Sequence, residues 1–168
     1  MSRQVLDFIT RRRSVREFTG DPVPREALEV ALRAAMAAPS GNNRRPWQFV
    51  VVTERSSITA LCHAHPYARF GSQAGAVVIP FGRREETRWF EQDMGAATEN
   101  LLLAIANLGL GATWCGMGEE LQAEVHSLVG LPDDQWAFAL IPVGVPREQP
   151  SPRTQYEEQR VHWEWYRS

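Results

Sequence analysis

Arginine residues that could bind an anion lie near the start of the chain. The stretch RRRSVREF (Arg11–Phe18) places four arginines and a serine close together. Guanidinium groups at this density repel one another unless anions compensate them, and they form strong bidentate hydrogen bonds with phosphate. The alternative is a solvated basic face paired with Asp7, Glu17 and Asp21, which is the usual role of a run of charges. The candidate phosphate ligands are Arg12, Arg13, Ser14 and Arg16.

A second distinctive stretch is APSGNNRRPW (Ala38–Trp47), which holds two prolines, a glycine and adjacent pairs of asparagine and arginine. This composition predicts a loop, because proline and glycine interrupt helices and strands. A helical pattern precedes it and a strand pattern follows it, so the loop is either a connector or a binding site. Trp47 is expected to pack in the core below the loop.

Other stretches only partly match known catalytic patterns. CHAH (Cys62–His65) holds two histidines that point in different directions on a helix, so a metal site is not favoured there. GLGATW (Gly109–Trp114) begins like a dinucleotide fingerprint, but it follows a helix and leads into a strand, the reverse of the required order. The sequence has no G-x-S-x-G, H-E-x-x-H or C-x-x-C motif. Neither a metal site nor a base–nucleophile pair is therefore expected.

Composition narrows the class of protein. The 168 residues are 43% hydrophobic and carry a net charge of −2, which fits a single domain with an ordinary core. That charge gives no general attraction to nucleic acid or to an anionic membrane. Cys62 and Cys115 are far apart in the sequence and are interpreted as reduced thiols. Without a signal peptide or an apolar run long enough to span a bilayer, we expect a soluble, cytoplasmic protein.

Hydrophobic periodicity predicts a mixed α/β domain in which helices pack on a sheet of four or five strands. The helices are expected from the start to about Arg12, from Pro24 to before Pro39, and over Ser56–Ala64, Asp93–Gly109 and Glu119–Val129. The strands are expected over Gln48–Thr53 and Ala76–Phe81, both buried on two faces, and over Ala112–Gly116, Trp136–Gly144 and Val161–Tyr166.

Residues 146–168 are expected to form an extended C-terminal arm, stiffened by Pro146, Pro150 and Pro152. The strand-like end VHWEWY (Val161–Tyr166) has no obvious place in the core of its own chain. An extended arm can pair with another subunit and make an obligate symmetric dimer. The alternative is an arm folded back on the edge of its own sheet.

Three of these stretches, in order, carry a resemblance to the nitroreductase family that covers nearly the whole chain. The family pattern is R-R-S-x-R-x-F, then A-P-S-x-x-N-x-Q-P-W before a valine-rich strand, then a helix of the type D-x-G-x-A-x-x-N-L-x-L-A-A-x-x-L-G-L-G. Here that helix reads DMGAATENLLLAIANLGLG (Asp93–Gly111). The resemblance implies an α+β fold with a largely antiparallel sheet flanked by helices, and a C-terminal arm exchanged in a homodimer.

The resemblance also implies two FMN molecules at the dimer interface, reduced by NADH or NADPH. Carried over by position, Arg12, Arg13, Ser14 and Arg16 would hold the phosphate, the ribityl chain and the pyrimidine side of the ring. Residues from the partner's loop would lie along the ring, and the segment Thr113–Met117 would pass its N5 edge with backbone groups. The remaining implied cofactor-binding residues are Pro39, Ser40, Gly41, Asn43, Arg45, Trp114, Cys115, Gly116, Met117 and Arg153.

The implied reaction is reduction of nitroaromatics, quinones or similar flat acceptors by ping-pong kinetics, with the flavin rather than a side chain carrying the chemistry. Another flavin reaction, such as that of a dehydrogenase, a dehalogenase or a flavin-cleaving enzyme, is an alternative, and so is a non-catalytic flavin-binding or sensing protein. The sequence departs from the family at Arg45, where glutamine is usual, and at GRREE (Gly82–Glu86), where many members insert lid helices. The site is therefore expected to be open or covered by Phe70 or the aromatic tail. Family members usually carry one further basic residue, and Arg69 is the candidate for that residue in this sequence.

Overall fold

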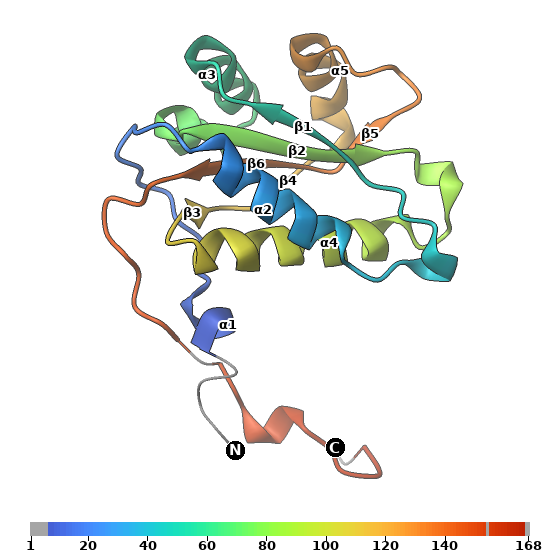
Figure 1. The fold of residues 1–168 in the computed structure, drawn as a ribbon. Helices are drawn as coiled ribbons and strands as arrows, with labels where there is room; N and C mark the ends of the chain where they lie inside the picture. The colour runs from blue at the N-terminus through green and yellow to red at the C-terminus, as the bar shows by residue number, and fades with distance from the viewer. Residues whose placement is uncertain (1–6, 154, 167–168) are drawn as a thin grey trace.

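The computed structural model describes residues 7–153 and 155–166, and it shows a sheet between two layers of helices (Figure 1). One layer lies on each face, as the predicted mixture of helices and strands requires. The α-helices are α1 (Asp7–Arg11), α2 (Arg25–Met36), α3 (Arg55–Ala64), α4 (Phe90–Asn107) and α5 (Glu119–Val129). Short 3-10 helices are η2 (Gly41–Asn43), η3 (Arg69–Gln73), η4 (Arg84–Glu86) and η5 (Glu158–Arg160).

The sheet is antiparallel at every strand pairing in the described residues, which confirms the expected fold class. Its six strands follow the order β1-β2-β6-β3, with β5 paired to β2 and β4 paired to β6. The strands are β1 (Gln48–Val52), β2 (Ala76–Gly82), β3 (Gly111–Ala112), β4 (Cys115–Gly116), β5 (Trp136–Ala137) and β6 (Ala139–Gly144).

Two predicted strands are each divided in two. The predicted strand 112–116 becomes β3 and β4, because the Thr113 amide donates to the carbonyl of Pro142 in β6 and Pro142 has no N–H to donate in return. The predicted strand 136–144 divides at Phe138, which donates its N–H to the Pro80 carbonyl at 2.8 Å. Pro80 has no N–H to donate in return, so the ladder is interrupted there.

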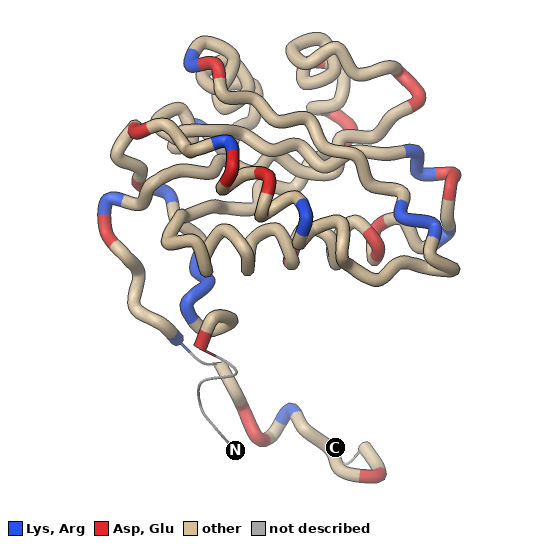
Figure 2. The backbone as a smooth tube through the Cα atoms, in the orientation of Figure 1, with Lys and Arg blue, Asp and Glu red and all other residues tan. Residues whose placement is uncertain are grey.

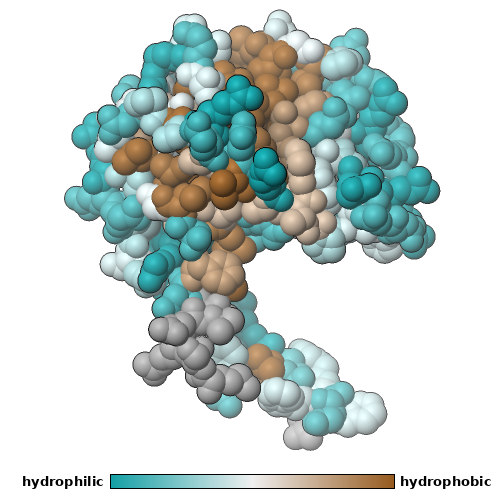
Figure 3. Space-filling view, viewed as in Figure 1, coloured by the Kyte–Doolittle hydropathy of each residue, from teal (hydrophilic) through white to brown (hydrophobic). Residues whose placement is uncertain are grey.

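The burial of strand β1 differs from the prediction. The strand was predicted to be buried on both faces, yet it lies at the edge of the sheet and, among the described residues, pairs only with β2. Gln48 is exposed and Phe49–Val52 are half-buried. Figure 3 shows hydrophobic side chains reaching the surface over β1, between α3 and α5.

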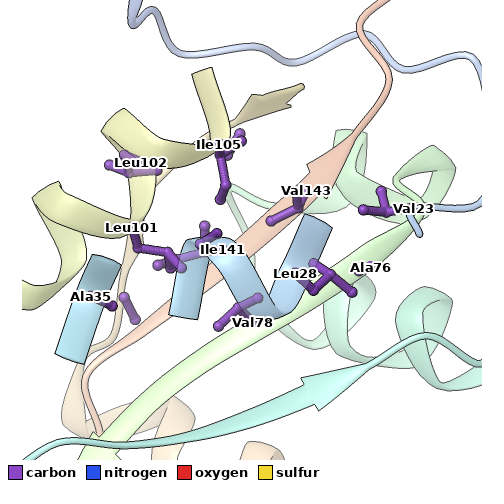
Figure 4. Packing of buried hydrophobic residues seen from close by; sticks show 13 residues of the cluster. Val23, Leu28, Ala35, Ala76, Val78, Leu101, Leu102, Ile105, Ile141 and Val143 are labelled. Carbon is purple, nitrogen blue, oxygen red and sulfur yellow. The ribbon is translucent and has the colours of Figure 1, made fainter. Parts of the chain in front are cut away.

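The larger part of the core lies between the sheet and the helices α2 and α4 (Figure 4). Leu28 of α2 and Leu101 of α4 meet Ile141 of β6, and the small Ala35 lets α2 approach α4 closely. Helices α3 and α5 cover the other face around Ile58, and Trp47 is buried in the core as expected. In α5 the predicted face is offset, because Leu128 is exposed and Gln122 is buried, where it bonds both backbone groups of Ala137.

The C-terminal arm leaves β6 and runs back along the first residues of the chain. The amides of Arg147 and Arg153 donate to the carbonyls of Glu17 and Thr10, at 3.0 and 3.2 Å. Beyond this point the arm extends away from the body of the molecule (Figure 1). The strand predicted over 161–166 is wrong for the chain by itself. These residues form bends with Trp163 75% exposed, because no sheet edge in the described part of the chain lies beside them.

Candidate functional site

The arginine-rich segment is held against the sheet by backbone contacts. The Val15 amide donates to the Ala112 carbonyl at 3.0 Å, and Ser14 forms a parallel bridge with Ala112. The approach is close because β3 begins with Gly111, where an added Cβ would lie 2.7 Å from the Val15 side chain. Since side chains alternate along extended backbone, this arrangement buries Val15 and leaves Ser14 and Arg16 exposed.

Arg12 and Arg13 face a hollow of about 370 Å³ between the end of α4 and the arm. Arg13 donates to the Ser151 carbonyl at 2.7 Å, so this guanidinium holds the arm in place. Arg12 forms an ion pair with Glu99 of α4, with 3.4 Å between Nε and Oε1. Pro150 and Pro152 close the hollow from the arm side.

Arg16 lies in a neighbouring hollow of about 400 Å³ that it shares with the segment Trp114–Gly116. Its guanidinium stands 5.8 Å from the centre of the Phe70 ring. Gly116 is exposed, and among the described residues nothing lies within 4 Å of the position that a Cβ would occupy there. The hollow therefore combines a cation, an aromatic ring and open backbone.

The same hollow is lined by two residues that sequence reasoning missed as site residues, His65 and Tyr67. The His65 side chain is only 2% exposed, and its Nε2 lies 2.9 Å from the carbonyl oxygen of Gly116. The only sequence signal was the CHAH stretch, which was considered as a metal site. Both His65 nitrogens are instead engaged, since Nδ1 accepts from the Tyr67 amide at 3.2 Å.

Neither cysteine has the properties of a reactive nucleophile. Burial raises the pKa of the Cys62 thiol to about 12, and the neighbouring Cys115 adds to the rise. Burial also raises the pKa of Cys115 to about 11, although the Arg16 charge opposes it. Both thiols stay protonated at neutral pH, so Cys115 contributes backbone and packing rather than reactivity.

The loop Pro39–Asn43 is fixed at the opposite end of α4. The Gly41 amide donates to Oδ1 of the buried Asp93 at 2.9 Å, and a Cβ on Gly41 would lie 2.5 Å from the Trp89 ring. Ser40 Oγ accepts from the Arg45 amide at 2.9 Å. Asn42, Asn43 and Arg45 have φ values of 52°, 55° and 51°. Backbone in this left-handed region is strained for arginine and persists where contacts impose it, often at functional sites.

One chain thus divides the predicted site residues into two groups. Arg12 and Arg13 line the hollow at the end of α4, Ser14 follows them, and Arg16 shares its own hollow with Trp114–Gly116. From there the segment runs toward the start of α4, where Trp114 and Met117 share a further hollow with Glu91. Arg153 is exposed and its backbone bonds Thr10. Pro39, Ser40, Gly41, Asn43 and Arg45 lie beside the start of α4. Figure 2 shows basic residues in both regions, after α1 and around η4.

In the described part of the chain, no helix has the length and apolar character needed to cross a bilayer. Within the same residues, His, Cys, Asp and Glu side chains do not gather in a group that could hold a metal ion.

Known proteins resemble this chain in sequence and in fold. Residues 9–69 and 59–145 match the nitroreductase family. The chain belongs to the nitroreductase family. A Methanothermobacter thermautotrophicus protein, provisionally named an NADH dehydrogenase/NAD(P)H nitroreductase, is 34% identical over 165 residues, covering 95% of this chain and 86% of its own. As a family member, this chain is an FMN-dependent, NAD(P)H-linked oxidoreductase.

Solved structures agree with this membership. A provisionally named NADH dehydrogenase/NAD(P)H nitroreductase of Bacteroides thetaiotaomicron is 34% identical and superposes with a TM-score of 0.93, covering 99% of this chain and 100% of its own. A provisionally named nitroreductase from Desulfovibrio desulfuricans, solved in complex with FMN, is 28% identical with a TM-score of 0.81, covering 99% and 100%. The sequence resemblance is therefore confirmed across almost the entire chain.

Proposed function

We propose that this nitroreductase uses NADH or NADPH to reduce nitroaromatics, quinones or similar flat acceptors by ping-pong kinetics. The observation that carries the proposal is the hollow where Arg16, Phe70 and the open backbone of Gly116 meet, next to the hollow lined by Arg12 and Arg13. A flat cofactor with a phosphate at one end needs both kinds of surface. When bound, FMN supplies the chemistry by taking a hydride from the nicotinamide donor and passing electrons to the acceptor.

The residues present fit FMN. Arg12 and Arg13 offer guanidinium groups that match a phosphate in bidentate geometry, and the exposed Ser14 lies between them and Arg16. Arg16 places a positive charge where negative charge on a reduced ring would be stabilised. Gly116 leaves space for close approach of a ring to the backbone. Arg153 would reach the phosphate from the arm.

We further propose that the site is completed by a second copy of the chain. The Gly41 amide is bonded to Asp93, whereas the arginine hollow is lined by Asn107 at the other end of α4. At 1.5 Å per residue, these two positions on the helix are about 21 Å apart. Pro39, Ser40, Gly41, Asn43 and Arg45 would therefore serve the flavin of the partner. The exposed aromatic arm and the half-buried edge strand β1 supply surfaces for the exchange.

Anaerobic titration with NADH and NADPH tests the proposed function. Bleaching of bound FMN by either donor, followed by recovery of the oxidised spectrum with a nitroarene or a quinone, is the expected result. Double-reciprocal plots should give parallel lines, because donor and acceptor would use one site in turn. FMN that binds but is not reduced by NADH or NADPH would identify a flavin-binding protein without this turnover.

A further inference from the structure

We propose that His65 is a positioning residue that aims the Gly116 peptide at the flavin. This inference rests on the proposed function, because it assigns a role toward the ring placed beside Gly116. His65 lies at the end of α3 and is buried, so its side chain is held by its surroundings. Its contact with the Gly116 carbonyl, at 2.9 Å, links the end of α3 to the segment Thr113–Met117.

The hydrogen bonds of the imidazole determine which nitrogen carries the proton. The Tyr67 amide can only donate, so Nδ1 of His65 accepts from it at 3.2 Å. The Gly116 carbonyl can only accept, so Nε2 carries the proton and donates to it. One neutral tautomer satisfies both contacts, and the ring orientation is thereby fixed.

The register of β4 explains why this carbonyl matters. Gly116 is opposite Ala139 of β6, and the Met117 amide donates to the Phe138 carbonyl at 3.2 Å. Hydrogen-bonded and non-hydrogen-bonded pairs alternate along an antiparallel ladder, so Gly116 occupies a non-hydrogen-bonded position. Its N–H and C=O therefore both face away from β6. The Gly116 N–H belongs to the preceding peptide group, and the pairing of Cys115 and Met117 with β6 holds the backbone extended on both sides of Gly116. With the C=O anchored by His65 as well, the Gly116 N–H is held in one direction.

A second contact ties the same two segments together. The Cys115 thiol donates to the Tyr67 carbonyl at 3.8 Å, beside the bond between His65 and Gly116. Tyr67 is thereby held at the rim of the hollow that contains Arg16. The short segment from His65 to Phe70 thus forms one wall of this hollow, at a site without the lid insertion.

The contact with His65 preorganises the Gly116 backbone for the flavin. A backbone N–H held in one direction interacts with a developing charge at no cost of reorganisation, whereas a mobile peptide must first be ordered. Loss of the His65 donor leaves the arginine hollow intact, so FMN should still bind. The position of the ring edge relative to the Gly116 peptide should then be less well defined.

The experiment compares three substitutions of His65 in the full-length, FMN-loaded protein. His65→Gln keeps a donor near the Nε2 position, His65→Asn places its amide near Nδ1 and does not reach Gly116, and His65→Leu removes both contacts. The matched control is His63→Leu, because His63 is exposed on the same helix. The measurements are FMN affinity, the bound-flavin absorption spectrum, the two-electron midpoint potential and the anaerobic rate of reduction by NAD(P)H.

We expect the flavin of His65→Asn and His65→Leu to be reduced at least about tenfold more slowly. This loss is smaller than the roughly 10²–10³-fold for removal of a preorganised donor itself, because His65 acts through Gly116. The midpoint potentials of both variants should fall, by about 30 mV for each tenfold loss in preference for reduced over oxidised FMN. FMN affinity should change less than about threefold, since the phosphate contacts lie in the other hollow. His65→Gln and His63→Leu should behave like the wild type.

Wild-type rates and potentials in His65→Asn and His65→Leu would overturn the proposal. Equal losses in His65→Gln and His65→Leu would also overturn it, because the retained donor would then have no effect. Should His65→Leu fail to fold, the comparison between the Gln and Asn variants still decides. Failure of the proposed function can be told apart from failure of the His65 proposal. In the first case the flavin of the wild type itself would not be reduced by NAD(P)H.

Discussion

Replacing Thr113 by valine removes one hydrogen bond between the arginine-rich segment and the segment that borders the proposed flavin site. Thr113 Oγ1 donates to the Val15 carbonyl at 2.7 Å, and the side chain is only 4% exposed. Valine has nearly the same shape, so packing is preserved while the carbonyl loses its partner. A buried acceptor left without a donor costs about 1–3 kcal/mol. For a chain of this size, that loss lowers Tm by about 2–12 °C.

The chain contains a matched control in Thr98 of α4. Thr98 is fully buried, and its hydroxyl has no hydrogen-bond partner among the described residues. Burying a polar group without a partner is unfavourable, so Thr98→Val should leave stability unchanged or increase it. The two substitutions are chemically identical, and they differ only in whether the hydroxyl is used.

Thermal melts of the apo and FMN-loaded proteins, together with flavin titration, measure both effects. We expect Thr113→Val to weaken FMN binding as well as the fold, because Val15 lies between Ser14 and Arg16. If FMN binding has to re-order the segment around Val15, the cost is at most the stability that Thr113→Val loses. Each 1.4 kcal/mol of that cost lowers the FMN affinity about tenfold. If Thr113→Val and Thr98→Val were equally stable and bound FMN equally well, the reasoning would be refuted.

Three further predictions follow from the site. Arg12→Ala and Arg16→Ala should each weaken FMN binding by about 1.5–3 kcal/mol, the range for a charge-assisted bond, while Arg25→Ala on the surface of α2 should not; titrations that match the wild type would contradict the assignment. Deletion from Ser151 onward should impair dimerisation and FMN binding together, as measured by light scattering and flavin retention; a flavin-loaded, folded monomer would show that the arm is dispensable. Both buried thiols, whose pKa values are raised to about 12 and about 11 from an ordinary value of about 9, should resist alkylation at pH 8 until the chain unfolds. Because the unfolded thiols lose protons first, stability should decline as pH rises from about 9 toward about 11–12, and a flat urea-unfolding profile over that range would contradict this.

Much of the fold could be predicted because long periodic segments dictate their own structure. The pattern of Leu101, Leu102 and Ile105 identified α4 correctly, and these three side chains are buried in the core. Shorter elements depended on tertiary context. The divided strands follow from Pro80 and Pro142, which lack an N–H at paired positions of the sheet, and this effect is not visible in local hydrophobicity. The Val161–Tyr166 pattern alternates like a strand, but a strand needs a partner edge, and the residues that the structure describes in one chain offer none beside it.

The site was less predictable because much of it is backbone geometry. The arginines and the loop Pro39–Asn43 were recognisable by composition and by their family motifs. His65 was not, because its proposed role depends on a hydrogen bond to Gly116, which is 51 residues away in the sequence. The strained φ angles of Asn43 and Arg45 also appear only in the structure.

The position of α4 is the structural reason for our proposal that two chains complete each site. The helix is 18 residues long, and it holds the Gly41 loop through Asp93 near its start and borders the arginine hollow through Asn107 at its end. Both contacts hold irregular backbone against the helix. The rigid helix therefore keeps the Gly41 loop and the arginine hollow at a fixed separation. A rearrangement that joined them within one chain would have to break the buried bond to Asp93 or the Val15 contacts with the sheet. Two chains related by symmetry can join the groups without breaking either, and they would do so twice, at two equivalent sites.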